Sequence, residues 1–333
     1  MLLKNILIRY FIITSIIILQ LLIILSKSTF FIWVFIELKM FLILVLLYQI
    51  TVKFNIYFRK LLIIIWYFVI QVLRRFFIFI GFLKYKFIMS LYIGILLKIG
   101  FFPLLYWVVY IYKKIPWIDI FVIGYLRKVG LFILFRKFII KYGLYKKFFF
   151  FVLFISYILR LVGIYSRIKN LKILAGWSSL KNFSILFFLN IYNSNLSIVL
   201  FFLYGIIFLY FCKFMNNLNI SSLVELNKLL MFKLNLVNFI KFCIIFFFFL
   251  GLPPFIIFFI KIIFTFFLRE ILDLWFIIFL ILIILFQILV YIKVINYVLI
   301  NLNLKYFIQN FKNLSLINIL KFFLFSGVFL YII

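Results

Sequence analysis

Long apolar runs alternate with short polar connections along almost the whole chain. Each run holds about 20 residues rich in Ile, Leu, Phe and Val, which is the length that an α-helix needs to cross a bilayer. The longest polar stretch, 215–235, is expected to be a connection or an interfacial helix that joins two halves. The pattern predicts helices at 5–26, 29–50, 61–82, 86–111, 118–140, 148–166, 172–192, 196–214, 237–268 (interrupted), 272–300 and 315–333.

The overall composition excludes a water-soluble protein. Of the 333 residues, 70% are hydrophobic, and the mean hydropathy is +1.40, whereas soluble domains are about 45–50% apolar. A chain this hydrophobic has too little polar surface to fold in water, and disorder requires low hydrophobicity. We therefore predict an all-α polytopic membrane protein with about 10–11 transmembrane helices, forming a single transmembrane domain over residues 1–333.

The charge and the missing histidines narrow the chemistry further. The chain has 36 Lys and Arg, 5 Asp and Glu and no His, giving a net charge of +31. Without His there is no bis-His haem, no His-ligated metal and no Ser-His-Asp triad. The basic residues lie between apolar runs, so we do not expect nucleic acid as a partner. Cys212 and Cys243 lie inside apolar runs and are expected to be small core residues.

Most basic residues lie near the ends of apolar runs and can reach the interface, but four charged residues do not obviously do so. A charge inside the bilayer costs about 3 kcal/mol and therefore indicates function. The four residues are Glu37, Lys98, Lys128 and Lys261. Two structural alternatives stay open: Glu37 could remain protonated or pair with Lys39, and Lys98 could reach an interface because its helix ends nearby.

Two of the lysines lie next to residues that break helices. Gly100 and Pro103 follow Lys98, and Gly251, Pro253 and Pro254 precede Lys261. Broken helices in corresponding positions of two halves are the sequence sign of an ion-transport site near mid-membrane. A lysine in a low-dielectric environment binds its proton less tightly, and a nearby carboxylate reverses that effect. The four charged residues can therefore form a proton relay, which a partner or an ion gradient must drive.

Several motifs occur in the order and spacing of a known family. Lys98-Ile-Gly-Phe-Phe-Pro103 with Trp107 fits the pattern K-x-G-x-x-P-x-x-x-W, and LGLPPFIIFFIK (250–261) resembles G-G-L-P-P-x-x-G-F-x-x-K. WVFIELKM (33–40) and LKILAGWSSL (171–180) match two further segments. Together these motifs span residues 33–261. Through them the chain resembles the antiporter-like membrane subunits of respiratory complex I.

The resemblance implies a fold of two inverted five-helix repeats with broken helices, at about 1–140 and 141–300, and a C-terminal helix in 301–333. It implies a proton relay of Glu37, Lys98, Lys128 and Lys261, with other membrane-arm subunits and the lipid bilayer as partners. It implies a location in the mitochondrial inner membrane, and the abundance of Phe, Tyr, Ile, Lys and Asn, whose codons are rich in A and T, is typical of an organelle gene. No cofactor is implied for this chain, and NADH, FMN, iron–sulfur clusters and ubiquinone are implied elsewhere in the complex.

The chain departs from the family pattern at several positions around the broken helices. Leu105 stands where relatives often carry His, and Val109-Tyr110 stands in place of a Pro-Glu pair. Ile257 and Ile260 stand where Gly and Pro are expected. These differences favour, as an alternative, a scaffold subunit that no longer pumps. A second alternative is a cation/proton antiporter subunit of the related family.

Overall fold

The described part of the protein is a bundle of α-helices. In this computed structural model the described residues are 2–52, 57–83, 88–100, 106–142, 152, 155–156, 158–159, 163, 170–223, 225, 244–245, 251 and 256–269. The helices are α1 (Leu2–Leu25), α2 (Thr29–Val52), α3 (Tyr57–Leu83), α4 (Ile88–Ile99), α5 (Tyr106–Tyr112), α6 (Trp117–Phe121), η2 (Val122–Leu126), α7 (Arg127–Tyr142), α9 (Leu171–Tyr192), α10 (Ser194–Asn217) and α13 (Ile256–Arg269).

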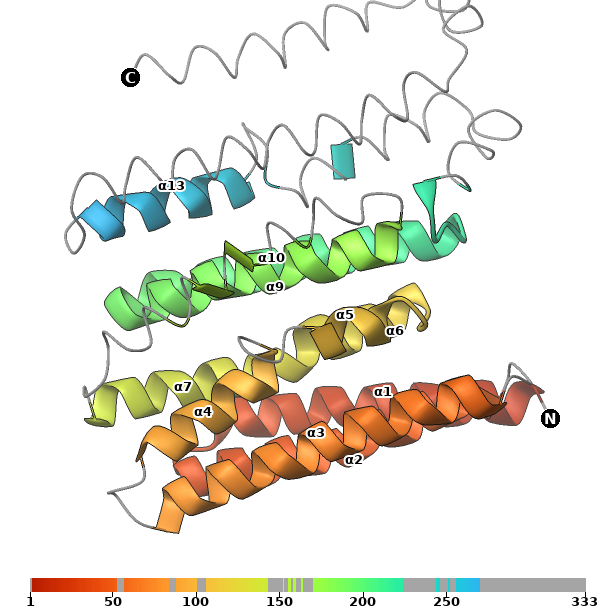
Figure 1. Cartoon of the computed structure of the whole chain (residues 1–333), viewed down its shortest axis with the longest axis horizontal. Helices are drawn as coiled ribbons and strands as arrows, with labels where there is room; N and C mark the ends of the chain where they lie inside the picture. The colour runs from red at the N-terminus through yellow and green to blue at the C-terminus, as the bar shows by residue number, and fades with distance from the viewer. Residues whose placement is uncertain are drawn as a thin grey trace, which may run out of the picture.

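The helices lie side by side in layers (Figure 1). At one side of the bundle α1, α2 and α3 pack together, and α4 packs on α3. Helix α7 contacts α1, α2 and α4 on one side and α9 on the other, while α13 packs against α9. A continuous series of packed helices therefore connects α2 with α13 through α7 and α9.

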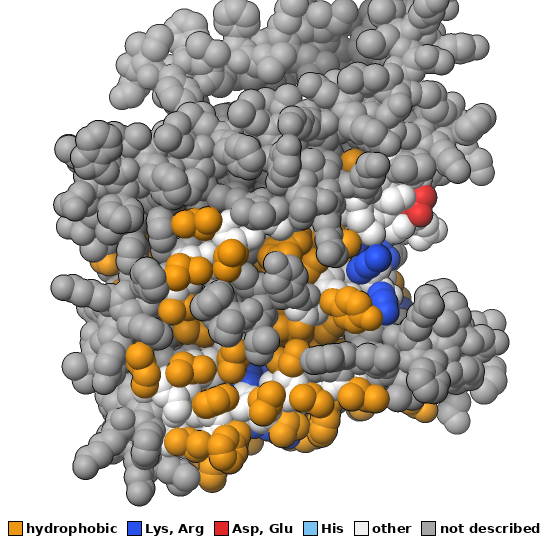
Figure 2. Space-filling view, in the orientation of Figure 1, with side chains coloured by type: hydrophobic (Ala, Val, Ile, Leu, Met, Phe, Trp, Pro, Cys, Tyr) orange, Lys and Arg blue, Asp and Glu red, His pale blue; other side chains and the backbone are white. Residues whose placement is uncertain are grey.

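Apolar side chains cover the outside of the described helices. Large hydrophobic residues are exposed on α1, α2, α3, α10 and α13, and on the face shown in Figure 2 the visible charged side chains are few and gather mainly at one end. Three described helices are long and apolar enough to cross a membrane, at Leu7–Leu25, Thr29–Gln49 and Asn195–Asn217. The all-α membrane class predicted from the composition is confirmed, and Cys212 lies in the core as expected.

Two predicted helices differ from the observed ones for local reasons. The run 86–111 is two helices, because α4 ends at Ile99 and Gly100 adopts φ +85°, a conformation that favours glycine. The run 118–140 begins with α6 and then passes through the π-helix η2 before α7. Pro103, Pro253 and Pro254 lie outside the described residues, as do 272–333. The count of about 10–11 transmembrane helices and the inverted repeats therefore remain predictions.

Candidate functional site

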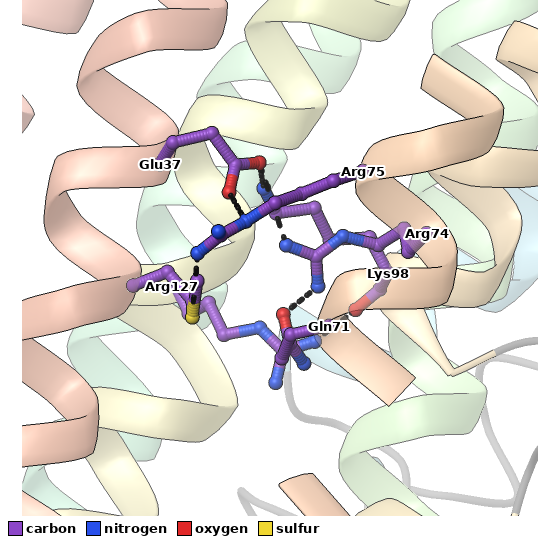
Figure 3. A network of polar contacts seen from close by, with 7 residues as sticks. Glu37, Gln71, Arg74, Arg75, Lys98 and Arg127 are labelled. Atoms are coloured by element: carbon purple, nitrogen blue, oxygen red, sulfur yellow. Dashed lines mark hydrogen bonds and ion pairs between the residues drawn. The ribbon is translucent and has the colours of Figure 1, made fainter. Parts of the chain in front are cut away.

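Glu37 lies at the meeting point of three helices and is shared by three cations. Its Oε1 accepts a hydrogen bond from Lys98 Nζ at 2.9 Å, and its Oε2 accepts one from Arg75 Nε at 2.6 Å. Arg74 Nη2 lies 3.6 Å from Oε1, and Nη1 of the same guanidinium donates to the Gln71 side-chain oxygen. Figure 3 shows these side chains converging from α2, α3 and α4. The expected relay residues Glu37 and Lys98 are therefore in direct contact.

Lys98 lies at the point where α4 ends, next to the break at Gly100. Lys98 lies in the last turn of α4, where backbone carbonyls lack helical partners and a cation is favourable. Arg127 of α7 donates to the Lys98 carbonyl, so it satisfies one of these groups. Lys98 is 1% exposed. The alternative in which Lys98 reaches an interface is therefore wrong.

Arg127 is held over two aromatic rings. Its guanidinium carbon lies 4.6 Å from the ring centroid of Trp107 and 5.5 Å from that of Tyr67. Ring faces stabilise a cation that has little water around it. Arg127 thus fixes the position of Trp107, which the sequence motif contains, beside the end of α4.

Lys39 belongs to a separate polar contact and does not bond to Glu37. Its Nζ donates to Gln20 and, at 2.6 Å, to the carbonyl of Leu126 at the end of η2. Helix geometry gives the reason, since residues two apart point to different sides of a helix. The alternative pairing of Glu37 with Lys39 is therefore wrong.

Lys128 faces α9. It is buried, and its Nζ lies 3.8 Å from the ring centroid of Phe183. Arg127 and Lys128 are adjacent on α7, so their side chains diverge. One extends toward α4 and the other toward α9, which places Lys128 between the Glu37 region and the later helices.

Lys261 is tied to the break before α13. Its Nζ donates to the Gly251 carbonyl at 2.8 Å, and Gly251 has φ +68°. A Cβ at this position would lie 2.5 Å from Ile257 Cγ2, so only glycine fits the observed backbone. The glycine break thus supplies a backbone acceptor for the buried lysine.

Sequence reasoning missed Lys181. This lysine of α9 is fully buried, and its charge interacts electrostatically with that of Lys261. It directly follows the motif LKILAGWSSL. Ser178, Ser179 and Asn182 lie beside it, so it does not stand out as a single charge among apolar residues. Arg74 and Arg75 interrupt the apolar run 61–82, but the sequence does not identify their partner, because Glu37 is more than thirty residues away.

The buried cations follow the packing order of the helices. Lys98 on α4, Lys128 on α7, Lys181 on α9 and Lys261 on α13 all have exposed fractions of 2% or less, and each helix packs against the next. In the described segments no group of three or more His, Cys, Asp and Glu side chains could hold a metal ion. The arrangement is suited to moving protons between titratable groups.

Comparison with known proteins supports the fold. No protein-family model matches the chain, and no curated protein matches its sequence. Among solved structures, it is similar to a chain of the membrane-bound sulfane sulfur reductase (MBS), an archaeal respiratory membrane complex, with a TM-score of 0.65 at 15% sequence identity. The match covers 85% of this chain and 65% of that chain. The protein is a multi-pass, all-α membrane protein with the fold of that chain.

Proposed function

We propose that the chain is a proton-translocating membrane subunit of respiratory complex I, corresponding to chain 2 of mitochondrial NADH:ubiquinone oxidoreductase. The observation that carries the proposal is the contact of Glu37 with Lys98 beside the break at Gly100. The order of the motifs supports the family. The similarity to a chain of an archaeal respiratory membrane complex supports a place in a respiratory membrane complex.

In this proposal protons move because Glu37 bonds to Lys98 through Oε1 and to Arg75 through Oε2, so a small shift of the carboxylate changes how strongly it stabilises Lys98. The carboxylate stabilises a protonated Lys98 while the two are in contact. A shift of Glu37 toward Arg75 weakens that stabilisation, and Lys98 then releases its proton toward Lys128. Lys181 and Lys261 continue the relay across α9 and α13. Oxidation of NADH and reduction of ubiquinone, with FMN and iron–sulfur clusters, belong to other subunits and drive the shift of Glu37.

The proposal is tested by the proton yield of the intact complex in sealed vesicles. Lys98→Ala is expected to lower the number of protons moved per NADH oxidised, with Lys113→Ala, which alters an exposed lysine, as the matched control. Native electrophoresis establishes that both variants assemble. An unchanged yield in assembled Lys98→Ala would overturn proton transfer through this chain and leave the scaffold function.

A further inference from the structure

The cluster around Glu37 carries more positive charge than its own residues neutralise. Glu37 pairs with Arg74, Arg75 and Lys98, and Arg127 joins the cluster through the Lys98 carbonyl (Figure 3), which gives 4 − 1 = +3. Arginine does not lose its proton in proteins, so the charge is still 3 − 1 = +2 when Lys98 is neutral. Uncompensated charge in a low-dielectric environment is costly, so the cluster requires a further anion.

The described part of the chain offers no second carboxylate to the cluster. Both carboxylate oxygens of Asp119 accept hydrogen bonds from Arg9 Nη2, at 2.7 and 2.8 Å. Glu225 accepts hydrogen bonds from Ser221 and Ser222. The two remaining acidic residues, Glu270 and Asp273, lie outside the described residues. A compensating carboxylate must therefore come from outside the described helices.

Arg75 is the member of the cluster that faces outward. Its side chain is 27% exposed, whereas that of Arg74 is fully buried. Within the described residues Arg75 contacts Glu37, Met40 and the ring of Phe41, and these contacts leave its Nη1 without an acceptor. Around it the surface is apolar, with Leu73 53%, Phe76 65% and Phe41 49% exposed. Arg75 is thus a charge in an otherwise apolar face of α2 and α3.

The depth of Arg75 favours a protein partner over a lipid headgroup. Residue 75 lies five positions from residue 70, the middle of α3, or about 7.5 Å along the axis. The half-thickness of the hydrocarbon layer is about 15 Å. An arginine that faces lipid extends toward the headgroups, but Arg75 turns sideways to Glu37 and Phe41.

We propose that the face of α2 and α3 around Arg75 is a docking surface for a transmembrane helix of a neighbouring subunit, and that this helix supplies an Asp or Glu carboxylate to Arg75. Guanidinium groups bind carboxylates through paired, charge-assisted hydrogen bonds. The exposed Leu73, Phe76 and Phe41 provide the apolar surface that packs on the rest of that helix. The inference rests on membership of a multisubunit complex, as in the proposed function, but not on proton transfer by Glu37.

Photo-crosslinking in the assembled native complex tests the docking surface. A photoreactive amino acid replaces Phe76, and the matched control replaces Ile206, which is 55% exposed on α10. Mass spectrometry identifies the crosslinked peptides. We expect residue 76 to capture a transmembrane peptide of another subunit that contains Asp or Glu. Capture of lipid alone, of a peptide without an acidic residue, or of the segment around Glu270 and Asp273 would overturn the proposal.

A second variant tests the role of the charge itself. Adding Arg75→Gln is expected to lower the crosslinking yield at residue 76 roughly tenfold, which is the effect of losing one charge-assisted hydrogen bond, while the yield at residue 206 stays unchanged. Arg75→Lys, which keeps the charge, is expected to retain part of the yield. An unchanged yield in Arg75→Gln would overturn the proposal. The proton yield of the same complex is measured separately, so failure of the docking surface and failure of the relay give different results.

Discussion

At the scale of single residues, Glu37 offsets part of the positive charge of the cluster around it. It is the partner of Arg74, Arg75 and Lys98, and two of these three cations have exposed fractions of 1% or less. Removing one carboxylate therefore leaves several charges uncompensated at once. Replacing a buried ion-pair partner is more damaging than replacing an exposed one, because the remaining charge has no water to solvate it.

Glu37→Gln is therefore expected to destabilise the protein by about 3 kcal/mol. Thermal unfolding of the detergent-solubilised complex measures the change. Glu225→Gln, at an exposed carboxylate near the polar connection, is the matched control and is expected to change the unfolding temperature little. Equal unfolding temperatures for the two variants would show that Glu37 does not compensate the surrounding cations.

Lys181→Met is expected to slow proton transfer through the subunit by about a hundredfold, the scale of one positioned acid–base group. Methionine keeps the length and apolar stem of the side chain but cannot carry a proton. Proton transport by sealed vesicles measures the effect. Lys213→Met on α10, where the lysine is exposed, should transport protons at the original rate, and a Lys181→Met rate equal to it would remove Lys181 from the relay.

The residue types of the site could be predicted, but most of the contacts could not. Glu37 and Lys98 stand out because charge is rare in apolar runs, but the sequence does not say whether Glu37 contacts a lysine. The pairing of Glu37 with Arg74 and Arg75 depends on how α2 and α3 are rotated against each other. Lys181 was missed because the apolar-run criterion detects isolated charges and not a lysine beside Ser, Asn and Trp.

At the scale of helices, breaks and irregular turns place the charged groups. The glycine break at Gly251 provides the acceptor for Lys261, and the π-helix η2 ends in the carbonyl that binds Lys39. Hydrophobic runs predicted most helices to within a few residues, such as 172–192 for α9 (Leu171–Tyr192). The π-helix was not predictable, since nothing in Val122–Leu126 departs from an ordinary apolar helix.

Gly251→Ala is expected to destabilise the protein by about 1–2 kcal/mol, because alanine is strained at positive φ and its Cβ would clash with Ile257. The carbonyl that binds Lys261 is displaced, so the proton yield should fall as well. Gly176→Ala on α9, where the added Cβ meets only the Tyr112 ring at 3.1 Å, is the control. If both variants unfold at the same temperature and pump equally, the break does not position Lys261.

At the scale of the whole molecule, the exposed apolar surface fits a membrane environment, and the proposed function predicts that the chain belongs to a larger membrane assembly. Native electrophoresis of mild-detergent membrane extracts, with mass spectrometry of each band, tests this. We expect the chain to migrate with NADH-oxidising activity in a high-mass complex. Migration in a small complex without that activity would favour the antiporter subunit, and ion gradients would then replace NADH in the transport measurements.

The long sequence separation of the buried contacts bears on how the helices enter the membrane during synthesis. Glu37 meets Lys98 61 residues later, and Lys39 meets the Leu126 carbonyl 87 residues later. At about 5–20 residues per second, α2 emerges several seconds before its partners exist. During that time Glu37 and Lys39 cannot rest in lipid without a large cost. Insertion of α2 together with α4 and α7 avoids this cost, because the partners of Glu37 and Lys39 then enter the bilayer with them.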